Sequence, residues 1–252
     1  LPLLEGESEI RLTTKIESKG YIDMTLKTLK TFGITVTETE NGWSIPGGQK
    51  YHGPRMRYAE GDWSNAAFWL VAGAIGGSIG CQGLDMESPQ GDRAIAALLE
   101  EFGAETKVAL NQITATHKEM KGIRIDASQI PDLVPILCVA AAAAEGKTEI
   151  YNAGRLRMKE SDRLAVMAEC MQKIGVEVEE KPDSIIITGG CNPPEGEIVI
   201  DSHNDHRIVM AMAIAAVSLG VELTILGAEA VNKSYPSFFI ELAKLGGVTN
   251  VL

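Results

Sequence analysis

The sequence of 252 residues predicts an α/β protein of the α+β type, in which repeated βαβαββ units pack around buried helices. Two observations predict this fold. Helix-like runs end in glycine at nearly regular intervals, and two short strand-like runs follow. The run from Leu133 to Ala144 is almost purely apolar, as expected of a buried helix. The order of elements mixes crossovers with hairpins, which favours several units around one core.

Two sets of glycines mark the repeat. The first set ends amphipathic helices at spacings of 70, 72 and 71 residues and consists of Gly33, Gly103, Gly175 and Gly246. The second set ends helix-like runs that lead into a strand and consists of Gly6, Gly76, Gly146 and Gly220. Strand-like runs follow the first set, as in Val176–Glu179 and then Ile185–Ile187. One unit therefore reads strand, helix, strand, helix, strand, strand over about seventy residues.

The first unit is incomplete at its start. Gly6 falls six residues into the chain, so the strand and most of the helix that should precede it are absent. We expect the chain to be the C-terminal part of a longer protein, truncated at its N-terminus. Residues 1–59 would finish one unit, and residues 60–252 would hold two complete units and a final half-unit. A boundary near Glu60 is favoured because a glycine-rich stretch ending at Pro54 breaks the pattern.

Composition and charge exclude several classes of protein. With 45% apolar residues, the chain can bury one large core or two smaller ones. A net charge of −11 disfavours nucleic acid and anionic membrane surfaces as partners, because both attract basic proteins. The longest apolar run is too short to cross a bilayer, and no signal peptide is visible. A soluble cytoplasmic protein is expected.

The sequence predicts neither a metal site nor a disulfide. The cysteines are Cys81, Cys138, Cys170 and Cys191, and none of them has CxxC spacing. Free thiols in a reducing cytoplasm are therefore favoured. The four histidines lack the spacing of zinc motifs. No cofactor is expected.

Two short charged clusters indicate an anion site. Lys159–Arg163 and Asp205–Arg207 each lie where a strand-like run gives way to an apolar helix, and each puts basic residues at a helix start. Acidic residues are favoured there because unpaired N–H groups make the first turn partly positive. The same partial charge attracts phosphate or carboxylate, and arginine matches either group with its planar fork. Local pairing of each arginine with an acidic neighbour in its own cluster explains the motifs equally well.

Three aspartates precede apolar helices, namely Asp62, Asp132 and Asp205. Aspartate at a helix start is above all an N-cap. We expect a cap at Asp62 and favour one at Asp132. At Asp132, however, burial at the mouth of its helix would raise the carboxyl pKa while the helix dipole lowers it.

Four basic residues have competing interpretations. Lys159 and Arg163 are four apart and would share one face if the helix starts by Lys159. Lys233 is alone in a loop, where a lysine is normally exposed to solvent without a function. A single histidine such as His206 is more often a capping or packing residue than a catalyst.

Taken together, five ordered segments resemble the signature segments of the EPSP synthase family, the 3-phosphoshikimate 1-carboxyvinyltransferases of the shikimate pathway. The segments are Ser18–Asp23, Glu60–Asp62, Arg157–Arg163, Asn204–Arg207 and Lys233–Pro236. The resemblance covers essentially the whole chain, and five ordered motifs are far more specific than one. It implies two domains, each with three βαβαββ units. Residues 1–59 would end the N-terminal, shikimate 3-phosphate-binding domain, and residues 60–252 would form most of the C-terminal domain.

The resemblance also implies roles for individual residues. Ser18, Asp132 and Lys159 match positions that bind shikimate 3-phosphate. Arg163, Arg207 and Lys233 match positions that bind phosphoenolpyruvate. Asp132 and Glu160 match the proton-transfer carboxylates, and Lys159 belongs with them among the catalytic residues. A carboxyl group that gives a proton and takes one back needs surroundings that separate the two pKa values.

The chain departs from the family pattern in several places. Arg155 stands where many members have Asn and receives no role, and Gly20 stands where many have Pro. The family's remaining phosphate-binding segments would lie upstream of Leu1. This chain would therefore carry about half of a site between two domains, with the missing N-terminal segment as its partner.

Two alternatives remain open at this point. One is a UDP-N-acetylglucosamine enolpyruvyl transferase of the same fold, although the reactive Cys loop of that enzyme is not recognisable here. The other is a catalytically incompetent anion-binding fragment.

Overall fold

The computed structural model describes residues 1–53 and 59–250, so Pro54 lies outside it. Leu1–Glu60 and Met86–Gly91 form a first unit, and Gly61–Asp85 and Asp92–Leu252 form a second. The chain therefore passes between the two units three times.

The first unit is a small sheet with one helix. Its elements are β1 (Ser8–Arg11), α1 (Lys19–Thr31), β2 (Thr37–Thr39) and β3 (Gly42–Ile45). The strands are antiparallel, in the order β1-β3-β2. In α1, a Cβ atom on Gly20 would come within 2.5 Å of the carbonyl oxygen of Pro89. This close approach leaves no room for a side chain at position 20.

The second unit contains the repeats. The first group of elements is α2 (Trp63–Gly76), β4 (Ser78–Gln82), α3 (Ile95–Phe102), β5 (Glu105–Ala109) and β6 (Gln112–Thr116). The second is β7 (Arg124–Asp126), α4 (Val134–Ala143), β8 (Lys147–Tyr151), α5 (Arg163–Lys173), β9 (Glu177–Lys181) and β10 (Ser184–Thr188). The third is β11 (Val199–Asp201), α6 (His206–Leu219), β12 (Thr224–Leu226) and α7 (Phe238–Lys244). The second group follows the predicted βαβαββ order.

The sheets combine crossovers with hairpins, as the sequence predicts. In the four-stranded sheet β7-β8-β10-β9, β7 runs parallel to β8, and β10 is antiparallel to both of its neighbours. Ile125, Ile150 and Ile185 are aligned across three of these strands, and all three are buried. Strands β11 and β12 repeat the parallel pairing, while the sheet β4-β6-β5 is antiparallel.

The spaced glycines end the helices for a stereochemical reason. Gly103 follows α3 with φ 109°, and Gly175 follows α5 with φ 80°. These left-handed backbone angles are unfavourable for residues with a Cβ atom. The regularly spaced glycines therefore mark the ends of the amphipathic helices, where the chain turns back toward the sheet.

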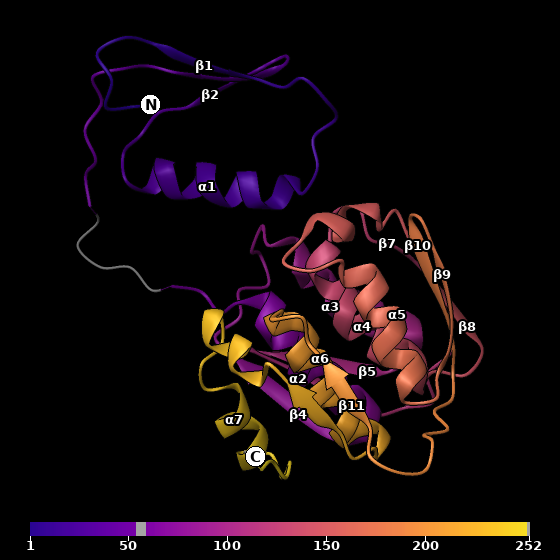
Figure 1. Ribbon diagram of the computed structural model, residues 1–252. Helices are drawn as coiled ribbons and strands as arrows, with labels where there is room; N and C mark the ends of the chain where they lie inside the picture. The colour runs from indigo at the N-terminus through magenta and orange to yellow at the C-terminus, as the bar shows by residue number, and fades with distance from the viewer. Residues whose placement is uncertain (54–58, 251–252) are drawn as a thin grey trace. The chain divides into compact units, whose positions relative to one another are not determined.

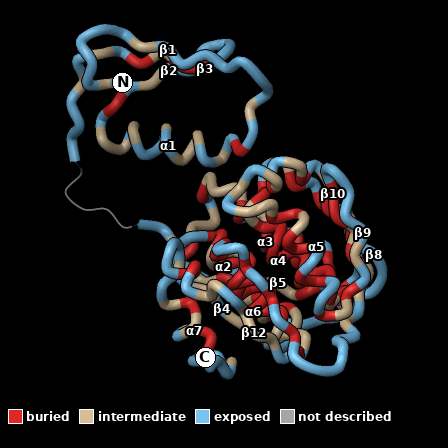
Figure 2. Tube along the Cα trace, in the orientation of Figure 1, coloured by how far each residue is buried: buried red, intermediate tan, exposed pale blue. Residues whose placement is uncertain are grey.

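Helices α2, α4 and α6 form the centre of the second unit, where buried residues are concentrated (Figure 1 and Figure 2). The three helices pack on one another, and α4 and α5 also contact the four-stranded sheet. In α4, nine of the ten residues are buried, which confirms the predicted buried helix. The four cysteines are free thiols. No helix in the described part of the chain has the length and apolar character needed to span a bilayer.

Candidate active site

The starts of three helices bring the charged clusters together in the second unit. Asp132 lies in a short 3-10 turn, Pro131–Leu133, that leads into α4. Arg163 is the first residue of α5, and Asp205 is the N-cap of α6. The positive ends of these helices therefore meet at one place, which favours bound anions and stabilises carboxylates.

Arg163 is the central cation of the cluster. Its guanidinium donates from Nη1 to Asp132 at 2.8 Å, from Nη2 to Glu160 at 2.6 Å and from Nε to Asp205 at 2.7 Å. The side chain of Arg163 is 1% exposed and that of Asp205 is 0% exposed. Removing two such charges from water is unfavourable unless their hydrogen bonds are satisfied, and here they are. Asp205 accepts a further bond from Ser161 Oγ at 3.0 Å.

Three cationic side chains contact the carboxylate of Asp132. Besides Arg163, it contacts Lys159 Nζ at 3.2 Å and Arg207 Nη2 at 3.3 Å. Burial by itself would raise the pKa of Asp132, but Arg207, Lys159 and Arg163 lower it to about 2. The N-cap that the sequence favours at Asp132 is wrong, because Leu133 occupies the N-cap position of α4. The Asp132 carboxylate instead binds side chains from distant segments. The two arginines of the predicted anion site nevertheless meet on this one carboxylate.

Glu160 and Lys233 form the outer part of the cluster. Lys233 Nζ donates to Glu160 Oε1 at 2.8 Å, and its side chain is 55% exposed. Burial would raise the pKa of Glu160, but the bond from Lys233 and the charge of Arg163 help to lower it to about 2. Both pKa values therefore lie well below 7, and these contacts do not separate them.

Local pairing explains only part of the two clusters. Arg163 does pair with Glu160, three residues away. The Arg207 side chain, in contrast, contacts Asp132, 75 residues away, and only its backbone N–H donates to Asp205, at 3.0 Å. Asp162 caps α5 by accepting from the Ala165 N–H at 3.0 Å. The clusters therefore belong to one tertiary network.

The helix α5 begins at Arg163 and not at Lys159. The predicted shared face for these two residues is therefore wrong, although both reach Asp132. The cap predicted at Asp62 is confirmed, because its carboxylate accepts from the Ser64 N–H at 2.8 Å. His206 is buried, and its pKa is lowered by burial and by Arg207. It is therefore neutral and packed at the start of α6.

Two of the sequence candidates lie elsewhere. Ser18 is buried in the first unit, where it precedes α1 in a left-handed conformation with φ 50°. Arg155 is exposed on the 3-10 turn Gly154–Met158. Among the described residues, no group of three or more His, Cys, Asp or Glu side chains is placed to hold a metal ion.

The cluster can bind anions because several of its cations converge where helices begin. Lys159, Arg163, Arg207 and Lys233 oppose Asp132, Glu160 and Asp205. Lys233 and Lys159 are the more exposed cations, and Arg163 is fully engaged by carboxylates. An arriving anion would therefore meet the lysines and Arg207 first, while Arg163 holds the carboxylates in place.

Sequence reasoning missed two buried carboxylates. Asp205 has a visible cap signal, but nothing in the sequence indicates that it is the buried partner of Arg163. Asp92 is 1% exposed and is hydrogen-bonded to Ser64 Oγ, and no residue in the described part of the chain hydrogen-bonds its Oδ1 atom. Its burial raises the pKa from 3.8 to about 6, although Ser64 and Arg207 lower it. Asp92 lies in a short 3-10 turn, Gly91–Ala94, and nothing in the sequence of this turn indicates that the aspartate is buried.

Replacing Asp92 with asparagine should make stability less dependent on pH. Because the folded-state pKa is raised, the folded protein holds the Asp92 proton more tightly than the unfolded chain does, and this stability is lost as pH rises from about 4 to about 6. A difference of about two pKa units corresponds to about 3 kcal/mol. Chemical denaturation of parent and Asp92→Asn between pH 4 and pH 8 measures it. The free energy of unfolding of the variant should rise relative to that of the parent as pH rises. A difference between the two that does not change with pH would contradict the assigned burial.

Comparison with known proteins identifies close relatives. The family model for EPSP synthase (3-phosphoshikimate 1-carboxyvinyltransferase) matches residues 1–242. Proteins named 3-phosphoshikimate 1-carboxyvinyltransferase from Clostridium acetobutylicum and Clostridium novyi are 48% identical over 250 residues and 44% identical over 248 residues. Both alignments cover 98% of this chain but 57% of the relative, so the chain spans little more than half their length.

Solved structures show the same fold. EPSP synthase from Acinetobacter baumannii, solved at 2.37 Å, matches with a TM-score of 0.76 and 31% identity, covering 97% of this chain and 57% of that one. The enolpyruvyl transferase NikO from Streptomyces tendae matches with a TM-score of 0.73 at 20% identity, covering 98% of this chain and 57% of that one. The second match shows the fold alone.

Proposed function

The chain belongs to the EPSP synthase family, and on that premise we propose that it carries part of an active site that transfers an enolpyruvyl group from phosphoenolpyruvate to shikimate 3-phosphate. The observation that supports this most is the junction of Arg163, Arg207 and Lys159 on one carboxylate at the starts of three helices. A ligand with one phosphate and one carboxylate needs several convergent cations.

We assign ligands as follows. Lys233, Arg207 and Arg163 bind phosphoenolpyruvate, and Ser18, Asp132 and Lys159 bind shikimate 3-phosphate. Lys233, whose side chain is 55% exposed, offers its charge to the incoming anion first, and Arg207, which is 11% exposed and bound to Asp132, offers charge deeper in the cluster. Arg163 contributes chiefly by holding Asp132 and Glu160 at fixed distances. The catalytic residues are Asp132, Glu160 and Lys159.

Substrate binding prepares the carboxylates for proton transfer. When phosphoenolpyruvate takes over Lys233, Glu160 loses the hydrogen bond that lowers its pKa, and its proton affinity rises. The shikimate 3-phosphate hydroxyl then adds to C2 and gives its proton to the Asp132 carboxylate, while Glu160 in its acid form gives a proton to C3. In the second step C3 returns a proton to Glu160, the C2–C3 double bond re-forms, and the C2–O bond to phosphate breaks so that phosphate leaves with the proton held by Asp132. This change would separate the pKa values of the two carboxylates, as proton transfer in both directions requires.

The domain assignment follows from the same premise. Residues 1–59 are the end of the N-terminal, shikimate 3-phosphate-binding domain, and residues 60–252 are the C-terminal domain. The remaining portion of the protein supplies the other phosphate-binding groups. The whole enzyme works in the cytoplasm without a cofactor and belongs to chorismate and aromatic amino-acid biosynthesis.

The test is substrate-dependent phosphate release by the full-length protein. With phosphoenolpyruvate, release should require shikimate 3-phosphate and should not occur with UDP-N-acetylglucosamine. The reverse preference would support the same-fold alternative, and no release with either substrate would support a catalytically incompetent anion-binding protein.

A further inference from the structure

Lys233 lies in a loop and forms an ion pair with Glu160. It is the last residue of the 3-10 turn Ala228–Lys233, and its side chain is mostly exposed apart from the ion pair with Glu160. An exposed ion pair between flexible side chains contributes little to order. The position of Lys233 therefore depends on what fixes the residues around it.

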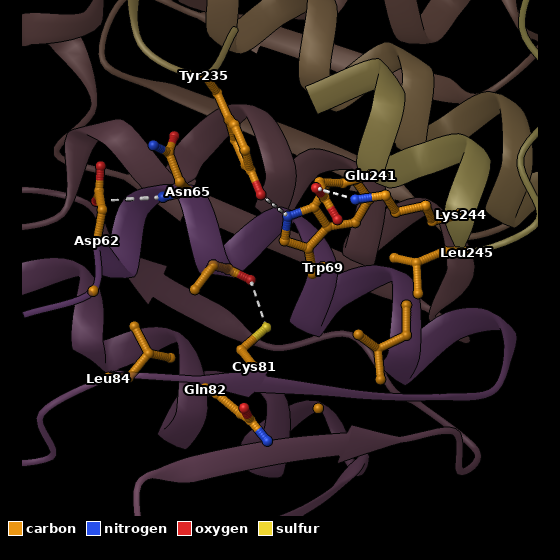
Figure 3. Close-up of a pocket in the computed structure, with 14 residues that line it drawn as sticks. Asp62, Asn65, Trp69, Cys81, Gln82, Leu84, Tyr235, Glu241, Lys244 and Leu245 are labelled. Carbon is orange, nitrogen blue, oxygen red and sulfur yellow. Dashed lines mark hydrogen bonds and ion pairs between the residues drawn. The ribbon is translucent and has the colours of Figure 1, made fainter. Parts of the chain in front are cut away.

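Tyr235 ties the end of this loop to α2, while Ala230 and Val231, in the turn itself, are also buried. Its backbone N–H donates to Val231 at 2.7 Å, which closes the loop around Lys233. Its hydroxyl oxygen accepts a hydrogen bond of 3.0 Å from Trp69 Nε1 on α2, 166 residues away in sequence. Figure 3 shows the Tyr235 ring extended toward Trp69, with the hydroxyl at the indole nitrogen.

Aromatic packing supports that hydrogen bond. The rings of Tyr235 and Trp69 meet edge to face at 6.1 Å, and Phe238 at the start of α7 packs against both. Phe238 is fully buried and Trp69 nearly so. Edge-to-face and offset pairs of this kind stabilise a specific geometry beyond their buried area. Trp69 and Phe238 therefore form a rigid surface on which Tyr235 rests.

One side of Tyr235 is not packed by protein. Tyr235 and Trp69 line a pocket of about 500 Å³, together with Asp62, Cys81 and Lys244. A ring beside such a space can move into it if its hydrogen bond is lost. The bond to Trp69 is thus needed to hold Tyr235, and through it the loop that carries Lys233.

We propose that Tyr235 is a positioning residue that holds Lys233 at the anion site through its hydrogen bond and ring contact with Trp69. The second part of this proposal, that the held lysine serves phosphoenolpyruvate, rests on the proposed function. Tyr235 itself touches no substrate. Its effect passes through the loop and is therefore specific to what Lys233 binds.

Two conservative variants test the proposal in the chain itself. Tyr235→Phe removes the acceptor and Trp69→Phe removes the donor, while both keep an aromatic ring. Lys233 should become more reactive toward trace acetic anhydride, because an ion-paired amine is partly protected. A rise of about two- to fivefold in Lys233 acetylation, read by mass spectrometry, is expected from the size of exposed ion pairs. Exposed Lys107 serves as the internal reference, and Tyr151→Phe, a hydroxyl deletion on β8, as the matched control.

A second readout uses the full-length enzyme. Both variants should raise KM for phosphoenolpyruvate and leave KM for shikimate 3-phosphate unchanged, a split that general loss of stability would not produce. Lys233 reactivity equal to that of Tyr151→Phe would overturn the positioning role. Raised reactivity with an unchanged KM for phosphoenolpyruvate would support the positioning role and would overturn the assignment of Lys233 to that ligand.

Discussion

Replacing Arg163 with methionine should lower the free energy of unfolding by about 3–5 kcal/mol, which is the usual cost of leaving buried charges without their partner. The variant leaves Asp205, which is 0% exposed, without its main counter-ion and removes one of three cations from Asp132. Methionine nearly preserves the volume, so the loss reports charge and hydrogen bonding more than packing. Urea denaturation at pH 7 measures the change.

Arg124 provides a matched control. Its Nε–Glu149 distance is 2.7 Å, the same as the Arg163 Nε–Asp205 distance, but its side chain is 71% exposed. Arg124→Met should cost no more than about 1 kcal/mol, because solvent screens an exposed pair. The loss of unfolding free energy should therefore be larger for Arg163→Met than for Arg124→Met. Equal losses would mean that Arg163 does not stabilise the fold through buried ion pairs.

Glu160→Gln in the full-length enzyme should lower turnover by about 10²–10⁴-fold, which is the usual contribution of general acid–base catalysis. Glutamine keeps the shape but has one acceptor oxygen in place of two, so it loses either the bond from Arg163 or the bond from Lys233, and it cannot give a proton and take it back. Substrate binding should change much less than turnover. Steady-state kinetics of phosphate release measure kcat and KM separately.

The control for Glu160 is Glu169, which forms an exposed ion pair with Lys173 on α5 at 2.8 Å. Glu169→Gln should leave both kinetic constants unchanged. If Glu160→Gln turned over at the parental rate, Glu160 would be only a counter-ion for Arg163 and Lys233. A lower kcat could also reflect loss of folded protein. Both variants are therefore assayed well below their unfolding temperatures.

Local features of the fold could be predicted from the sequence. The glycines at 103 and 175 indicate helix ends because only glycine tolerates the backbone there easily. The apolar run before Ala144 indicates a buried helix, and Asp62 indicates a cap, because each depends on residues within one or two turns. The family likeness rests on motifs that are also local, and the comparisons confirm it.

The tertiary parts of the site could not be predicted in this way. Asp132 has the sequence context of a cap, yet three cations from distant segments bind its carboxylate instead. The burial of Asp92 and the contact of Tyr235 with Trp69 also depend on how helices pack, which no local pattern encodes. The pKa values of the carboxylates depend on these contacts, so they could not be predicted from the sequence either.

We propose that this chain provides cations and proton-transfer carboxylates to a site completed by the part of the family's sequence that the chain does not span. The most direct test is phosphate release from phosphoenolpyruvate and shikimate 3-phosphate by the 252-residue chain, alone and with the remaining N-terminal portion added in trans. Alignment of reactants by a complete site can supply about 7–11 kcal/mol of barrier lowering, most of which a partial site forfeits. We expect little or no turnover alone and turnover on mixing. Robust turnover by the chain alone would contradict the claim.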